Sequence, residues 1–192
     1  MDIIIASNNS HKIKEISAIL EKSIRLIPLS KAGIREDIPE NALTLEENAL
    51  EKARYVHRKT GSNVFADDTG LEVEALNGAP GIFSARYAGP DKNSDNNIVR
   101  LLEELKNHKN RKARFRTAIA LIFDNKEYIF EGIINGRIIT EKRGNSGFGY
   151  DPVFLPDNEE YTFAEMPAQR KNMISHRAIA IKKLNDFLSS RL

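Results

Sequence analysis

The segment that decides the fold runs from Thr44 to Gly70 and reads TLEENALEKARYVHRKTGSNVFADDTG. Thr44 to Glu47 has the capping-box pattern found where helices begin. Apolar residues then recur on one helical face, and Gly61 supplies a common helix C-terminal stop. The apolar face consists of Leu45, Ala49, Ala53 and Val56. The pattern predicts an amphipathic helix that ends at Gly61.

A short apolar run, Asn63 to Ala66, follows this helix and ends at the acidic pair Asp67-Asp68. The run predicts a buried strand that delivers both aspartates at its C-terminal end. In open α/β sheets, ligands bind beyond the carboxyl ends of the strands. We therefore expect the acidic pair to lie in a functional site.

On the N-terminal side, an Ile-rich run over residues 2–6 predicts a strand, followed by a polar loop at residues 7–10. Ile13, Ile16 and Leu20 recur at helical spacing after this loop, and residues 23–28 predict another short strand. The N-terminal third therefore alternates strand and helix.

On the C-terminal side, apolar residues at helical spacing between Ile98 and Leu105 predict a further helix. Residues 114–123 and 128–139 flank Asp124-Asn125-Lys126 and predict a long β-hairpin. Ser175 is a candidate cap for a C-terminal helix. We expect an α/β fold with an antiparallel excursion, in one domain over residues 1–192 that can contain two lobes.

The composition is that of an ordinary globular protein, with 41% hydrophobic and 29% charged residues among 192. Apolar runs such as Ala118 to Phe123 are too short to span a bilayer, and no charged-then-apolar leader opens the chain. We expect a cytoplasmic protein that does not bind membranes.

The chain contains no cysteine, which excludes disulfides, thiolate metal sites and thiol nucleophiles. The formal charge of +2 is too small to predict nucleic-acid binding from bulk electrostatics. A basic stretch from Lys106 to Arg116 follows a predicted helix and enters a predicted strand, which is typical of a solvated face. Any anion site must be local, and we expect no nucleic-acid partner.

The segment Ser7 to Lys12 places hydroxyl and amide groups between a strand and a helix, with Lys12 about one turn into the helix. Free backbone N–H groups at a helix N-terminus suit a phosphate. The alternative is a simple Ser/Asn helix cap with a solvated lysine. The glycines and the Gly-Lys-Ser/Thr ending of a P-loop are absent.

The two adjacent carboxylates of Asp67 and Asp68 follow an apolar strand, where burying them costs free energy. The cost is offset if water, a cation or hydrogen-bond donors contact the two carboxylates. Oxygen ligands at a strand end suit Mg²⁺, which takes one or two carboxylates and shares the phosphates of the substrate. The alternative is an Asx-type turn. Because strand neighbours alternate faces, only one of the pair need point into the site.

Two further segments can bind a planar ligand. The loop from Gly144 to Pro152 combines three glycines with two aromatic residues, so a backbone can approach a base while a ring stacks on it. Ser175-His176-Arg177 offers donors for a base edge. The alternatives are a loop that only bridges strands and a helix start with exposed polar residues.

Taken in order, these motifs resemble those of the inosine-triphosphate pyrophosphatase family, also called the Ham1 or RdgB type. The matching motifs run from Ile5 to Arg177. They are Ser-Asn-Asn-x-x-Lys, Glu-Asn-Ala, Ala-Asp-Asp-Thr-Gly-Leu, Gly-Ala-Pro-Gly-Ile-x-Ser-Ala-Arg-Tyr-Ala-Gly, Gly-Phe-Gly-Tyr-Asp-Pro and Ser-His-Arg. The resemblance implies a long twisted mixed sheet flanked by helices, with two lobes and a central substrate cleft.

The resemblance also implies an activity, a cofactor and an assembly. The family cleaves the triphosphates of inosine, deoxyinosine and xanthosine to the monophosphate and pyrophosphate with Mg²⁺, as a homodimer. Carried over by position, Glu40 and Asp68 hold the metal, and Asp68 is also the proton acceptor. The implied substrate-binding residues are Ser7, Asn8, Asn9, Ser10, His11, Lys12, Thr69, Phe148, Gly149, Tyr150, Asp151, Lys171, His176 and Arg177.

The phosphate loop departs from the family pattern, which usually has Thr-Gly-Asn where this chain has Ser7-Asn8-Asn9. Ser keeps the hydroxyl, and Asn8 in place of Gly is tolerable because asparagine as a residue type adopts positive φ more readily than most residues. Ser10-His11 replaces a common Pro-Gly or similar pair. These changes affect the fine geometry of the loop and leave the reaction class unchanged.

The mechanism that we expect has Asp68 orient and deprotonate a water that attacks the α-phosphorus. Lys12 and the helix N-terminus stabilise the departing pyrophosphate. His176 and Arg177 donate to the 6-oxo group of the purine, which distinguishes inosine and xanthosine from adenine. Rejection of GTP needs a further contact near the 2-position.

Three alternatives remain. A Maf-type pyrophosphatase would cleave the same bond but prefer modified pyrimidines. A nucleic-acid-binding module would use Lys106 to Arg116 and show salt-sensitive affinity without turnover. A regulatory nucleotide-binding protein with a dead site would lack the acids, whereas Glu40, Asp67 and Asp68 are all present.

Overall fold

The computed structural model describes residues 1–36 and 38–191 and divides into two compact units. The first unit comprises Met1–Asp68, Thr117–Gly132 and Arg177–Leu192, and the second comprises Thr69–Arg116 and Ile133–His176. In the described part of the chain, no helix has the length and apolar character needed to cross a membrane.

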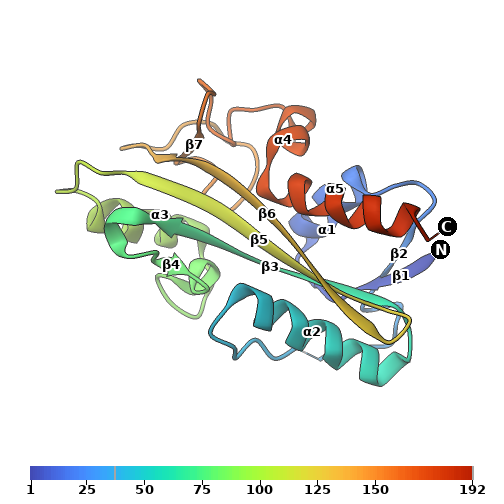
Figure 1. Ribbon diagram of the computed structural model, residues 1–192. Helices are drawn as coiled ribbons and strands as arrows, with labels where there is room; N and C mark the ends of the chain where they lie inside the picture. Colours follow the sequence, from blue (N-terminus) through green and yellow to red (C-terminus); the bar gives the residue numbers. More distant parts are fainter. Residues whose placement is uncertain (37, 192) are drawn as a thin grey trace. The chain divides into compact units, whose positions relative to one another are not determined.

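The strands form a mixed sheet in the order β2-β1-β3-β5-β6-β7, and β4 pairs with β3 (Figure 1). β1 is parallel to β2 and β3, whereas the β3–β4 and β6–β7 pairs are antiparallel. The strands are β1 Asp2–Ile5, β2 Arg25–Pro28, β3 Val64–Val73, β4 Pro80–Gly81, β5 Lys112–Phe123, β6 Lys126–Ile138 and β7 Phe154–Pro156. This mixed sheet confirms the expected α/β class.

Helices flank the sheet, and most of them begin within a few residues of the predicted positions. The α-helices are α1 Ser10–Ile19, α2 Leu45–Thr60, α3 Ser94–Glu104, α4 Ala168–Ile174 and α5 His176–Ser189. Short 3₁₀ turns occupy Glu74–Leu76 and Ser84–Arg86. The predicted hairpin is β5 and β6, joined by Asp124 and Asn125 with φ of 49° and 60°, as tight hairpin turns require.

Helix α2 forms because its sequence specifies both of its ends. The Thr44 hydroxyl accepts a hydrogen bond from the Glu47 backbone N–H at 3.1 Å. Gly61 ends the helix with φ 65°, a left-handed conformation that glycine adopts without steric cost. Acidic residues in the first turn and basic residues in the last turn stabilise the helix, because their charges interact favourably with the helix dipole. The predicted helix is therefore confirmed from cap to cap.

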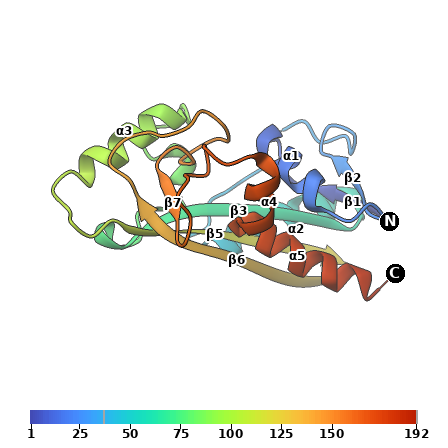
Figure 2. The same ribbon diagram turned by 90° about the horizontal axis from the view of Figure 1, so that it is seen from above.

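In the first unit, helices cover both faces of the sheet. One cluster packs α1 and α5 against Ile3 and Ile5 of β1 and Phe65 of β3. The other packs α2 against Ile4 of β1 and against Val64 of β3. Strand residues alternate between faces, so alternate residues of one strand enter different clusters. Figure 2 looks down on the face that α1 and α5 cover.

The second unit has its own apolar core. Residues from β3, α3, β5, β6 and the segment after β6 pack together, with Phe115, Phe154 and Phe163 at the centre of the aromatic contacts. Phe115 and Phe154 meet edge to face with ring centroids 4.7 Å apart. These contacts hold the segment that carries the loop from Gly144 to Pro152, which we call the glycine-aromatic loop.

The structure corrects the expected position of the acidic pair. β3 runs from Val64 to Val73, so Asp67 and Asp68 lie in the middle of a strand rather than at its C-terminal end or in a turn. β1 pairs with β3 only at Val64 and Phe65, after which β3 pairs with β4 at Leu71 and Glu72. The acids therefore sit beyond the end of β1, and the strand continues past them because its second half has other partners.

Candidate active site

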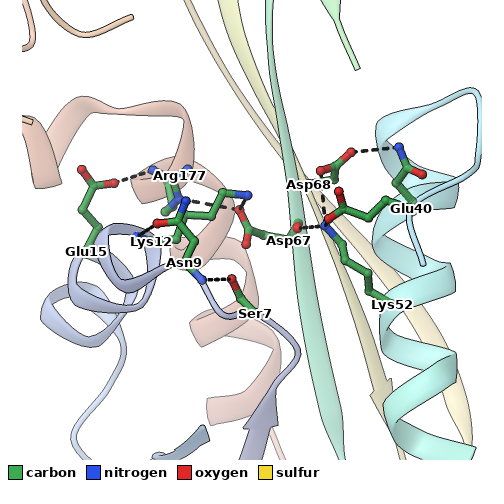
Figure 3. A network of polar contacts seen from close by, with 10 residues as sticks. Ser7, Asn9, Lys12, Glu15, Glu40, Lys52, Asp67, Asp68 and Arg177 are labelled. Carbon is green, nitrogen blue, oxygen red and sulfur yellow. Dashed lines mark hydrogen bonds and ion pairs between the residues drawn. The ribbon is translucent and has the colours of Figure 1, made fainter. Parts of the chain in front are cut away.

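The predicted phosphate loop lies between the end of β1 at Ile5 and the start of α1 at Ser10. Ser7 Oγ accepts a hydrogen bond from the Asn9 backbone N–H at 3.2 Å, and Asn9 Oδ1 accepts one from the Lys12 N–H at 3.1 Å (Figure 3). Both side chains therefore shape the loop and cap the helix, as the cap alternative requires. Their contact with phosphate stays a prediction.

Three other predicted substrate-binding residues are Asn8 in the loop and Ser10 and His11 in the first turn of α1, and all have exposed side chains. Asn8 is not among the described residues with positive φ, so this asparagine needs none of the left-handed freedom that glycine would supply. The first turn of α1 contains no acidic residue. The positive end of the helix dipole is therefore not offset by a carboxylate on that turn.

Asp67 is the centre of a buried group of charges on the side of α1 and α5. Lys12 Nζ lies 2.8 Å from Asp67 Oδ2, and Arg177 Nε lies 3.8 Å from the same oxygen. The Asp67 side chain is inaccessible to solvent, and Arg177 is only 1% exposed. The sequence positions 12, 67 and 177 are thus brought together in the first unit (Figure 3).

Asp68 belongs to a different group, which is built on α2. Lys52 Nζ donates to Glu40 Oε1 at 2.7 Å and lies 3.3 Å from Asp68 Oδ1. Asn48 Nδ2 donates to Asp68 Oδ2 at 3.1 Å, while Asn48 Oδ1 accepts from the Ala42 N–H at 3.0 Å. Asn48 therefore ties Asp68 to the loop that carries Glu40.

The two neighbouring aspartates leave β3 on opposite faces. Asp67 continues the face of Phe65, which packs with α1 and α5, and Asp68 continues the face of Val64, which packs with α2. The Lys52 ammonium links the two residues, because it also donates to the Asp67 backbone oxygen at 2.7 Å. Figure 3 shows the carboxylates pointing to different sides of the strand.

Charge and burial give the two carboxyl groups opposite pKa shifts. Burial alone raises the pKa of Asp67, but the charges of Lys12, Arg177 and Lys52 outweigh burial and hold the pKa well below its ordinary value. Burial raises the pKa of Asp68, and the lowering by Lys52 and Lys12 does not cancel it. Asp67 therefore stays ionised to lower pH than an ordinary aspartate, whereas Asp68 takes up a proton at higher pH than an ordinary aspartate does.

Lys52 remains charged although it is buried. Burial alone lowers the pKa of Lys52, but Asp68, Glu40 and Asp67 together raise the pKa above its ordinary value. The Asp67 carboxylate is paired with Lys12 and Arg177. Lys52 therefore faces two further carboxylates, Glu40 and Asp68, which leaves an excess of negative charge on the α2 side. A further cation is the natural counter-charge for that excess.

The donor set fits Mg²⁺ in its chemistry. Glu40 and Asp68 offer carboxylate oxygens around one ammonium group, and Mg²⁺ typically takes one or two protein carboxylates. Among residues 1–36 and 38–191, no group of three or more Asp, Glu or His side chains could enclose a metal. The remaining coordination positions would therefore fall to water and substrate phosphates.

In the second unit, Asp151 organises the glycine-aromatic loop. Its Oδ2 accepts from the Phe148 backbone N–H at 2.8 Å and from Lys171 Nζ at 2.5 Å. The Lys171 ammonium also lies 5.1 Å from the centre of the Phe148 ring, within cation–π range. Asp151 and Lys171 are both buried. The predicted residues Phe148, Asp151 and Lys171 are therefore brought together.

The other predicted residues of the second unit occupy different surroundings. Tyr150 is buried and donates to the Ser84 carbonyl at 2.8 Å, so its hydroxyl anchors the loop. His176 is buried and stacks on Phe115 with centroids 4.6 Å apart. Thr69 and Gly149 are half-buried. The substrate contacts predicted for these four residues stay predictions.

Sequence reasoning missed Lys52, Asn48 and Glu15. Asn48 and Lys52 fall on the buried face of α2 beside Ala49, Ala53 and Val56. A lysine on an otherwise apolar helical face is rarely buried without a partner, and that pattern is a usable signal for an ion-pair site. Glu15 carries no such signal, because its partner Arg177 is 162 residues away along the chain.

Comparison with known proteins gives matches over nearly the full length of this chain. The model of the Ham1 family matches residues 3–187. The chain is 55% identical over 187 residues to the dITP/XTP pyrophosphatase of Porphyromonas gingivalis, covering 97% of this chain and 96% of the relative. It is 52% identical to the dITP/XTP pyrophosphatase of Flavobacterium johnsoniae, covering 99% of both chains.

A solved structure agrees with this similarity. The Ham1 protein of Staphylococcus aureus is 40% identical and superposes with a TM-score of 0.92 over 100% of both chains. Sequence and structure therefore point to the same set of relatives over the full length.

Proposed function

This chain belongs to the Ham1 family, and on that basis we propose that it hydrolyses non-standard purine nucleoside triphosphates such as ITP, dITP and XTP. The products are the nucleoside monophosphate and pyrophosphate. Removal of these triphosphates keeps them out of the nucleotide pool. The substrate class rests on the names of the relatives, which are dITP/XTP pyrophosphatases.

One structural observation carries the proposed reaction. A buried ammonium, Lys52, holds Glu40 and Asp68 at 2.7 Å and 3.3 Å, and the neighbouring residue Asp67 binds Lys12 of the phosphate loop at 2.8 Å. Adjacent positions of β3 therefore carry Asp68, a carboxylate suited to proton transfer, and Asp67, a carboxylate that positions the Lys12 ammonium of α1, a cation suited to phosphate. This arrangement supports attack on a phosphorus rather than passive nucleotide binding.

Asp68 is the proposed general base. Its raised pKa brings proton uptake closer to neutral pH than in an ordinary aspartate, which favours proton transfer in the operating range. Asn48 donates to its Oδ2 and fixes the carboxylate plane. Asp68 would orient a water towards the α-phosphorus and take its proton.

Lys12 and the N-terminus of α1 are the proposed phosphate holders. The ammonium is positioned by Asp67, and the helix N-terminus presents backbone N–H groups and a positive dipole end. Both would bind the β- and γ-phosphates and stabilise the charge of the leaving pyrophosphate. The proposed cofactor is Mg²⁺ on Glu40 and Asp68, where it would supply charge neutralisation at the triphosphate.

Base recognition is assigned to Phe148, Lys171 and His176 of the second unit and to Arg177. Phe148 presents an aromatic ring next to the Lys171 ammonium, which suits stacking on a purine. Hydrogen-bond donors from His176 and Arg177 at the purine 6-position would favour a 6-oxo purine over adenine, whose 6-amino group is itself a donor. Arg177 contacts Glu15 and Asp67, and a contact between its guanidinium and the base stays a prediction.

Isotope labelling tests the proposed bond cleavage. Hydrolysis of dITP in ¹⁸O-water should place the label in the deoxyinosine monophosphate and leave the pyrophosphate unlabelled, because water attacks the α-phosphorus. Mass spectrometry of both products reads the result. Label in pyrophosphate, or release of orthophosphate as the first product, would exclude the proposed reaction.

We also propose that the protein is a homodimer and acts in the cytoplasm, both on the basis of the family resemblance. Light scattering should then give a mass close to twice 21.7 kDa. A mass of one chain across micromolar concentrations would contradict the dimer. Recovery in the membrane fraction of disrupted cells would contradict the location.

A further inference from the structure

Glu15 lies one helical turn after Lys12 on α1, so both side chains leave the same side of the helix. The Glu15 carboxylate accepts a hydrogen bond from Arg177 Nη1. The Arg177 side chain is 1% exposed and that of Glu15 is 15% exposed. Figure 3 shows this pair beside Asp67. The Arg177 guanidinium therefore has almost no access to solvent and depends on carboxylates of the protein for its counter-charge.

The pair is part of a row of four charged side chains in which each contacts the next. Arg177 Nε lies 3.8 Å from Asp67 Oδ2, and Lys12 Nζ lies 2.8 Å from the same oxygen. The row runs from Glu15 through Arg177 and Asp67 to Lys12. It begins and ends on α1, because Glu15 and Lys12 belong to that helix. Two cations therefore share one oxygen of Asp67, and a second carboxylate holds one of them.

This sharing has a consequence for Lys12. A buried guanidinium that loses one carboxylate is strongly destabilised unless another anion compensates for it. Asp67 is a second anion within 4 Å of Arg177, and it already binds Lys12. Loss of the Glu15 charge would therefore draw Arg177 towards Asp67 Oδ2, in competition with Lys12.

We propose that Glu15 is a positioning residue of the phosphate site, which neutralises Arg177 and so reserves Asp67 for Lys12. This role rests on the proposed function, because it matters only if Lys12 binds a phosphate chain. It does not require Glu15 to touch a substrate. The role differs from simple helix packing because the effect of Glu15 on phosphate binding passes through Arg177 and Asp67 and ends at Lys12.

Binding of inorganic pyrophosphate measures the phosphate site without the base and without turnover. Titration calorimetry in the presence of EDTA should show that Glu15→Gln weakens pyrophosphate binding by about tenfold, the size expected for disturbance of one charged hydrogen bond. Glu21→Gln is the matched control, because Glu21 is an exposed glutamate shortly after the end of α1. It should change affinity by less than about twofold.

A double-mutant cycle separates positioning from general damage. In a Lys12→Met background, Glu15→Gln should have no further effect on pyrophosphate affinity, because the side chain through which it acts is gone. Glu15→Asp keeps the charge and should recover most of the affinity. A merely structural role would instead give equal losses in both backgrounds, accompanied by a lower melting temperature.

Two results would overturn the inference. One is a Glu15→Gln protein that binds pyrophosphate as well as the unchanged protein does. The other is an equal loss of affinity in the presence and absence of Lys12. Failure of the proposed function is a separate outcome, recognised when the unchanged protein neither binds pyrophosphate nor releases it from dITP.

Discussion

Asp67 and Asp68 are adjacent in sequence, yet their carboxylates point to opposite faces of β3 and bind different lysines. Asp67 holds Lys12 at 2.8 Å, and Asp68 lies 3.3 Å from Lys52. The two carboxylates of the acidic pair therefore do not bind the same cation. It joins a phosphate-holding group on α1 to a base-and-metal group on α2, and the two substitutions Asp67→Asn and Asp68→Asn should have different effects.

Asp68→Asn should lower kcat by about 10²-fold to 10⁴-fold, the range for loss of a general base. Pyrophosphate binding should remain, because Lys12 keeps its partner Asp67. Asp67→Asn should instead weaken pyrophosphate binding and raise KM, because Lys12 and Arg177 lose their shared anion. Steady-state kinetics with calorimetry measure both. Equal effects of the two substitutions on kcat and on pyrophosphate affinity would contradict the division.

The pH dependence of activity should respond to Lys52. A general base must be ionised, so activity falls as pH falls through the pKa of Asp68, which burial raises and Lys52 lowers. Lys52→Gln removes the lowering charge, so the acid limb of kcat/KM should move to higher pH at constant Mg²⁺. Lys59→Gln, an exposed change on the same helix, is the control. An unchanged limb, or one shifted to lower pH, would argue against Asp68 as the base.

Removal of the metal should abolish turnover, and Glu40 should set the metal requirement. Glu40→Gln removes one of two proposed carboxylate ligands, so more Mg²⁺ should be needed for half-maximal activity, by about tenfold. Glu103→Gln, an exposed change in the second unit, should leave the requirement unchanged. Activity that survives EDTA would be inconsistent with the proposed cofactor.

Gly147 should be essential for the conformation of the glycine-aromatic loop. Its φ is +78°, and a Cβ there would lie 2.1 Å from Asp151 Oδ2, the atom that binds Lys171 and the Phe148 N–H. Gly147→Ala should therefore raise KM for dITP. Gly33 has the same φ with no atom within 4 Å of an added Cβ, so Gly33→Ala carries only the backbone strain of about 1–2 kcal/mol. Equal KM values for the two variants would contradict this role.

The fold could be predicted from sequence wherever local signals agree. Thr44, the apolar face of α2 and Gly61 specify that helix completely, and the turn residues of the β5–β6 hairpin are equally clear. The elements that were missed, β4, α4 and β7, have two, seven and three residues, too few to display a period. The length of β3 was missed because its second half pairs with β4, a two-residue strand that the sequence pattern does not reveal, and because β3 also lies beside β5, which is distant in sequence.

The candidate site was predictable in its residue types and only partly in its contacts. The motifs located Lys12, Glu40 and Asp68, but could not indicate that Lys52 lies between Glu40 and Asp68. Partnerships such as Arg177 with Glu15 join residues 162 positions apart. Sequence spacing carries no information about such pairs, because tertiary packing alone brings them together.

The most direct test of the central claim is pyrophosphate release from a panel of triphosphates, with and without Mg²⁺. The panel contains ITP, dITP, XTP, GTP, ATP and a modified pyrimidine triphosphate. We expect Mg²⁺-dependent release from ITP, dITP and XTP, with kcat/KM well above that for ATP and GTP. Turnover of ATP comparable to that of ITP, or a preference for the modified pyrimidine, would contradict the proposed function.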